Sequence, residues 1–169
     1  MRFAGAAALT AACLLLGQYF SRCLTMRVRQ LEAATVMLGV IRTKLQYSCC
    51  PVSELVEELA SRDDIAVLRF IRPCAEACRS GKDFPVAWRE ALGERENISN
   101  FKADDVKKLT AFGETLGTTA IEGQLASCDM YTALLGESLA CARNDMKKYS
   151  KLFPALGVLF GIAVLVIAA

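Results

Sequence analysis

The hydrophobic pattern of the C-terminal third of the chain predicts one long helix that ends in a membrane. Apolar or small side chains recur there at alternating spacings of four and three residues, as in a heptad repeat. They are Ile121, Leu125, Cys128, Thr132, Leu135, Leu139, Ala142, Met146 and Tyr149. The stripe continues without a turn signal into residues 152–169, which carry no charge. At about 1.5 Å per residue this segment is roughly 27 Å long, close to the thickness of a hydrocarbon core.

A second apolar segment lies near the other end of the chain. Residues 3–20 contain neither charge nor proline, and a helical stripe follows them at Leu24, Val28, Leu31, Leu38, Ile41 and Leu45. We interpret the segment as an uncleaved membrane helix, because a signal peptide would have a longer basic region and a small-x-small cleavage site. The predicted domains are a transmembrane helix at 1–21, a helical bundle at 22–151 and a transmembrane helix at 152–169.

Basic residues beside the two apolar segments predict the orientation. Three arginines follow the first segment and three lysines precede the second: Arg22, Arg27, Arg29, Lys147, Lys148 and Lys151. Both groups lie on the bundle side, and basic residues concentrate on the cytoplasmic side of membranes. The bundle is therefore expected in the cytoplasm, with both chain ends across the membrane.

Interruptions of the pattern within the bundle predict about six antiparallel helices and an all-α fold. Pro51 separates the first helix from a short one that Ser53 is expected to cap. Asp63 and Asp64 are expected to open the next helix, and Pro73 to kink it, because proline lacks a backbone donor.

The remaining helices have their own start signals. After a polar loop at residues 94–102, Asp104 or Asp105 is expected to begin a helix. Thr119 and Glu122 form a capping-box pattern for the long final helix. We place the polar loop, as a hypothesis, at the end of the bundle farthest from the membrane.

Composition narrows the possible functions. The 20 basic and 18 acidic residues nearly balance, so no strong field favours nucleic acid. The chain has no histidine, which removes the commonest general base and a common zinc ligand. We predict a protein that is not an enzyme and has no cofactor, metal, nucleic-acid partner or small-molecule substrate.

The cysteines leave one alternative open. The chain has eight of them: Cys13, Cys23, Cys49, Cys50, Cys74, Cys78, Cys128 and Cys141. Their dispersal is typical of reduced, buried thiols in a cytoplasmic protein. Cys74 and Cys78 share a helix face, however, so a membrane-tethered thiol enzyme or redox sensor is the rival hypothesis, with a zinc site a weaker one.

Two glycine pairs suggest close helix contacts. Gly113 is expected to allow a close helix approach, and Gly117 to end its helix in a left-handed conformation. Partner docking is the alternative for this pair. Gly157 and Gly161 form a small-residue face suited to helix association in lipid, either with the first apolar segment or with a foreign helix.

Acidic side chains supply the candidate docking residues. Most are interpreted as solvated helix faces and caps, and their other use would be an acidic docking surface. The candidates are Glu54, Glu57, Glu58, Asp63, Asp64, Asp104 and Asp105.

An ordered set of short motifs along nearly the whole chain resembles the stage III sporulation protein AB family. The motifs are Arg29-Gln30-Leu31, Leu45-Gln46-Tyr47, Pro51 with Leu55, Trp88 in Ala-Trp-x-x-x-Leu, Phe112-Gly113-x-x-Leu116-Gly117, Gln124 and Leu156-Gly157-x-x-x-Gly161. Two acidic positions expected in the family are absent, one before Tyr47 and one after Gly117.

The resemblance implies a non-enzymatic platform subunit, related in fold to the cytoplasmic domain of type II secretion and type IV pilus platform proteins. It implies a place in the channel between mother cell and forespore, in the mother-cell membrane around the forespore. The implied partners are a cytoplasmic secretion-type ATPase and other membrane subunits of the channel. A stand-alone, membrane-anchored helical adaptor is the remaining alternative.

Overall fold

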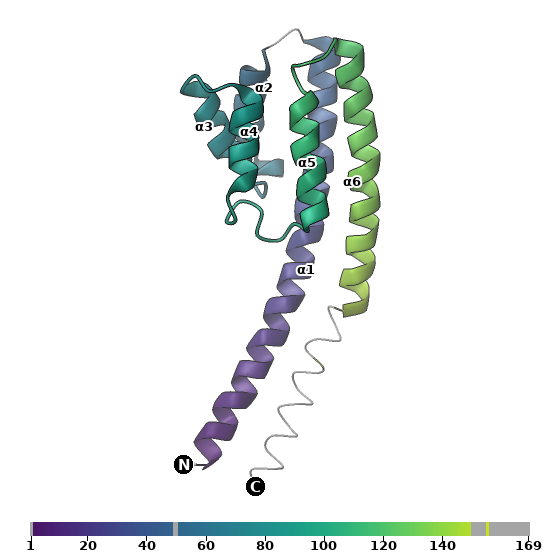
Figure 1. Cartoon of the computed structure of the whole chain (residues 1–169). Coiled ribbons are helices and arrows are strands. Elements are labelled where there is room, and N and C mark those ends of the chain that lie inside the picture. Colours follow the sequence, from purple (N-terminus) through teal and green to yellow (C-terminus); the bar gives the residue numbers. More distant parts are fainter. Residues whose placement is uncertain (1, 49–50, 150–154, 156–169) are drawn as a thin grey trace. The chain divides into compact units, whose positions relative to one another are not determined.

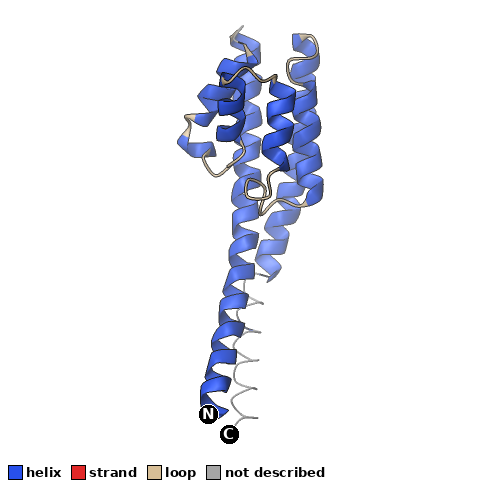
Figure 2. Cartoon of the chain, turned by 60° about the vertical axis from the view of Figure 1, so that its left-hand side comes forward, coloured by secondary structure: helices blue, strands red, loops and turns tan. Residues whose placement is uncertain are grey.

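The computed structural model describes residues 2–48, 51–149 and 155, and all regular elements among these residues are helices (Figures 1 and 2). They are α1 (Arg2–Tyr47), α2 (Val52–Ala60), the short 3₁₀ helix η1 (Asp63–Ile65), α3 (Ile71–Arg79), α4 (Phe84–Gly93), α5 (Ala103–Thr115) and α6 (Ile121–Tyr149). The prediction of an all-α chain is confirmed for the described residues.

Contacts divide the chain into two compact units, which we describe separately. The bundle unit is Arg29–Leu139, and the terminal unit combines Met1–Val28 with Ala140–Ala169. The bundle unit lies inside the predicted 22–151 domain and omits both ends of it.

Three helical segments of the bundle unit, from α1, α5 and α6, run side by side in both views (Figures 1 and 2). The part of α1 in this unit buries an apolar stripe whose side chains are fully excluded from solvent: Leu31, Ala34, Met37, Leu38 and Ile41. A guanidinium–carboxylate pair fixes α1 to α6, with Arg42 Nε 2.7 Å from Asp129 Oδ1. The α6 stripe contributes Cys128 and Leu135 to the core, whereas Ile121 is 48% exposed and lies outside it.

A chain of aromatic rings joins α4, α5 and α6. The Trp88 ring centroid lies 5.3 Å from that of Phe84 and 6.3 Å from that of Phe112. Phe112 in turn lies 5.7 Å from Tyr131 of α6. Phe70 makes an edge-on contact with Trp88 at 5.1 Å, which connects the segment before α3 to the same cluster. Aromatic pairs at such distances stabilise a core beyond the area they bury.

The start of α3 differs from the prediction. Asp63 and Asp64 begin only the three-residue η1, and α3 begins at Ile71. Pro73 therefore lies in the first turn of α3 and produces no kink, because the first backbone amides of a helix have no intrahelical acceptor. Ser53 is likewise not a cap, because α2 already begins at Val52, after Pro51.

Two other predicted helix starts shift by one or two residues. α5 begins at Ala103, and the Asp105 carboxylate accepts a hydrogen bond from the Lys102 amide at 3.0 Å. α6 begins at Ile121, so Thr119 and Glu122 are not the reciprocal capping pair. The Gln124 carboxamide closes this corner instead: it accepts from the Gly117 amide at 3.1 Å and donates to the Thr119 carbonyl at 2.8 Å.

The terminal unit contains the beginning of α1 and the end of α6. Arg27 Nη1 lies 3.9 Å from Asp145 Oδ2, and Val28 and Ala142 are buried. α1 exposes four large apolar side chains in this unit: Leu15, Leu16, Tyr19 and Phe20. Among the described residues, no helix has the length and apolarity needed to span a membrane. The predicted C-terminal membrane helix, with Gly157 and Gly161, lies outside the described residues apart from Ala155.

Candidate interaction surfaces

Gly113 of α5 lies against the Trp88 side chain of α4. A Cβ atom at this position would overlap the Trp88 indole ring, so only glycine fits without movement. The Trp88 Nε1 donates a hydrogen bond to the Leu109 carbonyl at 2.8 Å, which fixes the ring against α5. Gly117 has a φ of 80°, the left-handed region that glycine adopts without steric cost. Gly113 is buried inside the bundle unit, whereas Gly117 is exposed in the turn after α5.

Four of the seven acidic candidates form ion pairs within the chain. Glu57 Oε1 lies 3.1 Å from Arg79 Nε, and Glu58 Oε2 lies 2.7 Å from Lys44 Nζ. The other two pairs are Asp64 with Arg62 at 2.7 Å and Asp104 with Lys108 at 2.8 Å. These cations hold the pKa values of the Asp64 and Asp104 carboxyls below the ordinary range, chiefly through the hydrogen bonds they donate.

The remaining three acidic candidates have different surroundings. Asp105 is 1% exposed and occupied as the helix cap described above, so it is not available to a partner. Glu54 and Asp63 are exposed, and neither has an ion pair among the described residues. They are the two candidate carboxylates still available for docking.

The candidates do not gather on one surface of the bundle unit. Glu58 pairs with Lys44, which lies close to the end of α1. Asp104 pairs with Lys108, whose Nζ also donates a hydrogen bond of 2.9 Å to Ser138 of α6. Arg42, which is close to Lys44 on α1, contacts α6 at Asp129. The end of α1 near Glu58 and the start of α5 near Asp104 therefore contact α6 at different positions. At about 1.5 Å per residue, Asp129 and Ser138 are roughly 13 Å apart along α6. Figures 1 and 2 show the loop between α4 and α5 at the end of this unit where α1 enters it, opposite the α5–α6 connection. The prediction that this polar loop lies at the end of the bundle farthest from the first apolar segment is therefore wrong.

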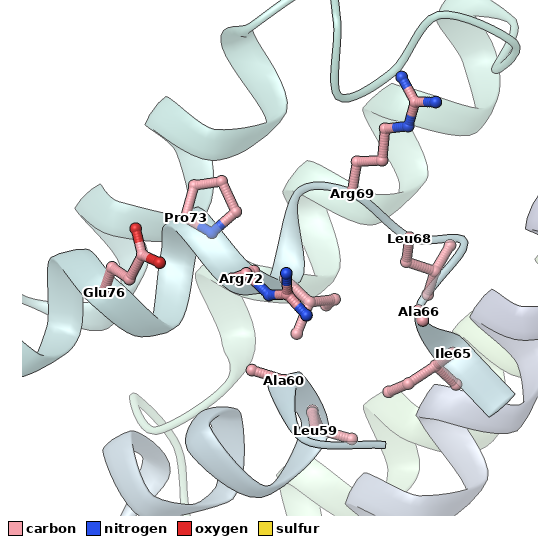
Figure 3. Close-up of a pocket in the computed structure, with 10 residues that line it drawn as sticks. Leu59, Ala60, Ile65, Ala66, Leu68, Arg69, Arg72, Pro73 and Glu76 are labelled. Atoms are coloured by element: carbon pink, nitrogen blue, oxygen red, sulfur yellow. The ribbon is translucent and has the colours of Figure 1, made fainter. Parts of the chain in front are cut away.

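A cleft of about 290 Å³ opens between the end of α2, η1 and the start of α3 (Figure 3). We call it the α2–α3 cleft. Seven of its ten lining residues are apolar, and the other three carry a charge. The lining residues are Leu59, Ala60, Ile65, Ala66, Leu68, Arg69, Ile71, Arg72, Pro73 and Glu76.

The two arginines at the rim of the cleft were not among the sequence candidates. Arg69 and Arg72 are exposed, and neither has an ion pair among the described residues. In Figure 3 Arg72 lies across the middle of the cleft and Arg69 extends away from it. The sequence signal that could have found them is the presence of two basic residues within the apolar segment at residues 68–72.

The three described cysteine thiols of the bundle unit have little thiolate character. Burial raises the pKa of Cys74 and Cys78, and it raises the pKa of Cys128 to about 11. Because the thiolate is the nucleophile and the metal ligand, this shift weighs against a redox or zinc role for these residues. Within the described part of the chain, no group of cysteine and carboxylate side chains is arranged to hold a metal ion.

Taken together, these features define an all-helical bundle protein with a small apolar cleft and two rim arginines. The sequence model of the stage III sporulation protein AB family matches residues 2–168, and the chain belongs to that family. Comparisons with curated proteins and with solved structures gave no match.

Proposed function

We propose that the chain is a membrane platform subunit of the sporulation channel between mother cell and forespore. Membership of the stage III sporulation protein AB family over residues 2–168 is the observation that carries this proposal. The platform connects a cytoplasmic secretion-type ATPase to the other membrane subunits of the channel, and it does so by binding and not by catalysis. The bundle unit faces the mother-cell cytoplasm.

Attachment to the membrane is part of the proposal. No charged residue interrupts the apolar segment at residues 3–20. Towards the end of this segment, Leu15 and Leu16 of α1 are 66% and 57% exposed. Tyr19 and Phe20 follow at 63% and 51% exposure, and Arg22 comes two residues after Phe20. Aromatic and then basic side chains are typical of the boundary between lipid and cytoplasm. This order supports an N-terminal anchor, and the charge-free residues 152–169 support a second.

Docking of the ATPase is expected to involve the available carboxylates at the α2 side of the bundle unit. Glu54 and Asp63 are exposed and form no ion pair among the described residues, so each can pair with a basic side chain of a partner. Glu57, Glu58 and Asp64 lie in the same region but already have partners within the chain. Rim charges of this kind tune association rate and salt dependence more than total affinity.

Co-purification from sporulating cells tests the proposal. The tagged wild-type chain should retain the ATPase together with other channel subunits, and a Glu54→Lys, Asp63→Lys variant should retain less ATPase but the same membrane subunits. A Glu96→Lys, Glu137→Lys variant changes the net charge equally at exposed positions elsewhere and serves as the control. The docking proposal fails if the wild-type chain holds the other subunits and no ATPase.

A further inference from the structure

We propose that the α2–α3 cleft docks an acidic, apolar segment of a partner protein. This inference deepens the proposed function, because it gives the platform a second, positively charged docking site. It does not depend on which subunit supplies the segment.

The first observation is the apolar lining of the cleft. Its floor is formed by aliphatic side chains that are 1–2% exposed, namely Leu59, Ile65, Leu68 and Ile71. Ala66 and Pro73 form exposed parts of its walls, where neither contributes a charged group. The volume of about 290 Å³ lies just below the roughly 300–1,000 Å³ of small-molecule pockets. Such a cleft suits one or two apolar side chains of a peptide better than a whole cofactor.

The second observation is the charge at the rim. Asp64, which precedes the two arginines in sequence, is already bound by Arg62 through two hydrogen bonds of 3.0 and 2.7 Å. Arg69 and Arg72 are left without an ion pair among the described residues. Glu76 is the one carboxylate in the lining, so the rim retains an excess positive charge that matches a carboxylate on the occupant.

The position of Arg72 argues against a purely structural role. It is the second residue of α3, and no acidic residue lies in this first turn. The amino end of a helix carries a partial positive charge, so an arginine there is electrostatically unfavourable for the fold. An incoming carboxylate would be stabilised by Arg72 and by the helix end together.

The same features disfavour a nucleic acid or a lipid surface as the occupant. Lipid headgroups are typically bound by clusters of about four to eight basic residues, and nucleic acids by extended basic stripes. Two arginines and one glutamate beside an apolar floor fit a protein segment in which a carboxylate neighbours leucine-like side chains.

Fluorescence anisotropy with the purified full-length chain in detergent micelles tests the proposal. The probe is a short labelled peptide of leucine and glutamate, compared with counterparts that carry glutamine or lysine in place of glutamate. The glutamate peptide should bind about tenfold more tightly than the glutamine peptide. Arg69→Ala, Arg72→Ala should remove this preference, whereas Arg95→Ala, Lys107→Ala, which removes two exposed cations elsewhere, should keep it.

Charge reversal provides a test that loss of folding cannot mimic. An Arg69→Glu, Arg72→Glu variant should bind the lysine peptide in preference to the glutamate peptide, which requires a folded cleft. The proposal would be overturned if the Arg69→Ala, Arg72→Ala variant and the Arg95→Ala, Lys107→Ala variant lost the preference for the glutamate peptide equally. It would also be overturned if the charge-reversal variant did not prefer the lysine peptide. Replacing the leucines of the probe by serine should abolish binding, and unchanged binding would also refute it.

The other possible occupants have distinct signatures. Binding to phosphatidylserine vesicles that depends on Arg69 and Arg72, without peptide binding, would reject a protein segment in favour of lipid. Self-association of the chain that disappears in the Arg69→Ala, Arg72→Ala variant would reject a segment of another protein in favour of a second copy of this chain. The peptide assay contains no other channel subunit, so its failure leaves the ATPase proposal standing. Conversely, loss of ATPase co-purification with intact peptide binding contradicts only the proposed function.

Discussion

Gly113 lies against the Trp88 ring with no space for a side chain. Gly113→Ala should destabilise the bundle by about 1–3 kcal/mol, because either the indole or the α5 backbone must move. Gly136→Ala on α6 is the matched control: nothing lies within 4 Å of its added Cβ, and alanine should stabilise the helix by about 0.5–1 kcal/mol. Urea unfolding of both variants measures the difference. Equal midpoints would contradict the close contact.

The burial of Cys128 predicts a pH-dependent reactivity. Its pKa is raised from 9.0 to about 11, so at pH 8 the thiolate fraction is about a hundredfold smaller than that of an ordinary thiol. Iodoacetamide should therefore label the exposed Cys141 of the native protein well before Cys128, as read by mass spectrometry of peptides. Labelling of both residues should become equal on unfolding. Rapid native labelling of Cys128 at pH 8 would revive the thiol-enzyme alternative.

The same shift has a stability consequence with a defined sign. The Cys128 thiol holds its proton more tightly in the folded chain than in the unfolded chain. Its contribution to stability is therefore complete below about pH 9 and lost as the pH rises through about 11.

At the scale of the elements, the α6 stripe belongs to the interior of the bundle unit over part of its length. Leu135 is 1% exposed and Ile121 is 48% exposed. Leu135→Ala should cost about 2–5 kcal/mol, while Ile121→Ala should stay within about 0.5 kcal/mol. Denaturant unfolding at several protein concentrations measures both. If the α6 stripe were the contact surface of a dimer, the loss of stability in Leu135→Ala would depend on protein concentration, whereas burial within one chain would make it independent of concentration.

Helix existence was predictable from periodicity, whereas the starts of α2, α3, α5 and α6 were not predicted to the residue. The prediction of a kink at Pro73 assumed one helix from Asp63 onward, because the pattern of residues 65–78 is continuous at helical spacing. The chain instead turns after η1, buries Phe70 against Trp88 and restarts at Ile71. Tertiary contacts of this kind override local signals, which is why the arginine-lined start of α3 could not be anticipated.

The glycine and acidic candidates show the same limit. A Gly-x-x-x-Gly spacing indicates close approach, but only the fold identifies Trp88 as the neighbour of Gly113. The carboxylates of α2 resemble a free acidic face in sequence, because their partners are distant: Lys44 lies 14 residues from Glu58, and Arg79 lies 22 residues from Glu57. Long-range ion pairs, here Glu58 with Lys44 and Glu57 with Arg79, neutralise that face.

At the scale of the whole molecule, the proposed orientation predicts which cysteines face the cytoplasm. In a chain otherwise free of cysteine and expressed in vegetative cells, the exposed Cys141 should resist a membrane-impermeant maleimide added to intact cells and react after permeabilisation. A cysteine introduced by Ala169→Cys should react without permeabilisation, because two membrane passages place both chain ends outside the cytoplasm. The opposite pattern would reverse the topology and remove the ATPase from reach.

Direct binding of the ATPase to this chain is the central claim, and cosedimentation with proteoliposomes tests it without other subunits. Purified ATPase should sediment with liposomes that contain only the wild-type chain, and should remain in the supernatant with empty liposomes. The Glu54→Lys, Asp63→Lys variant should reduce the sedimented fraction, and added salt should reduce it further, because exposed charge pairs are screened. ATPase that stays in the supernatant with wild-type proteoliposomes whose bundle units face outward would contradict the account.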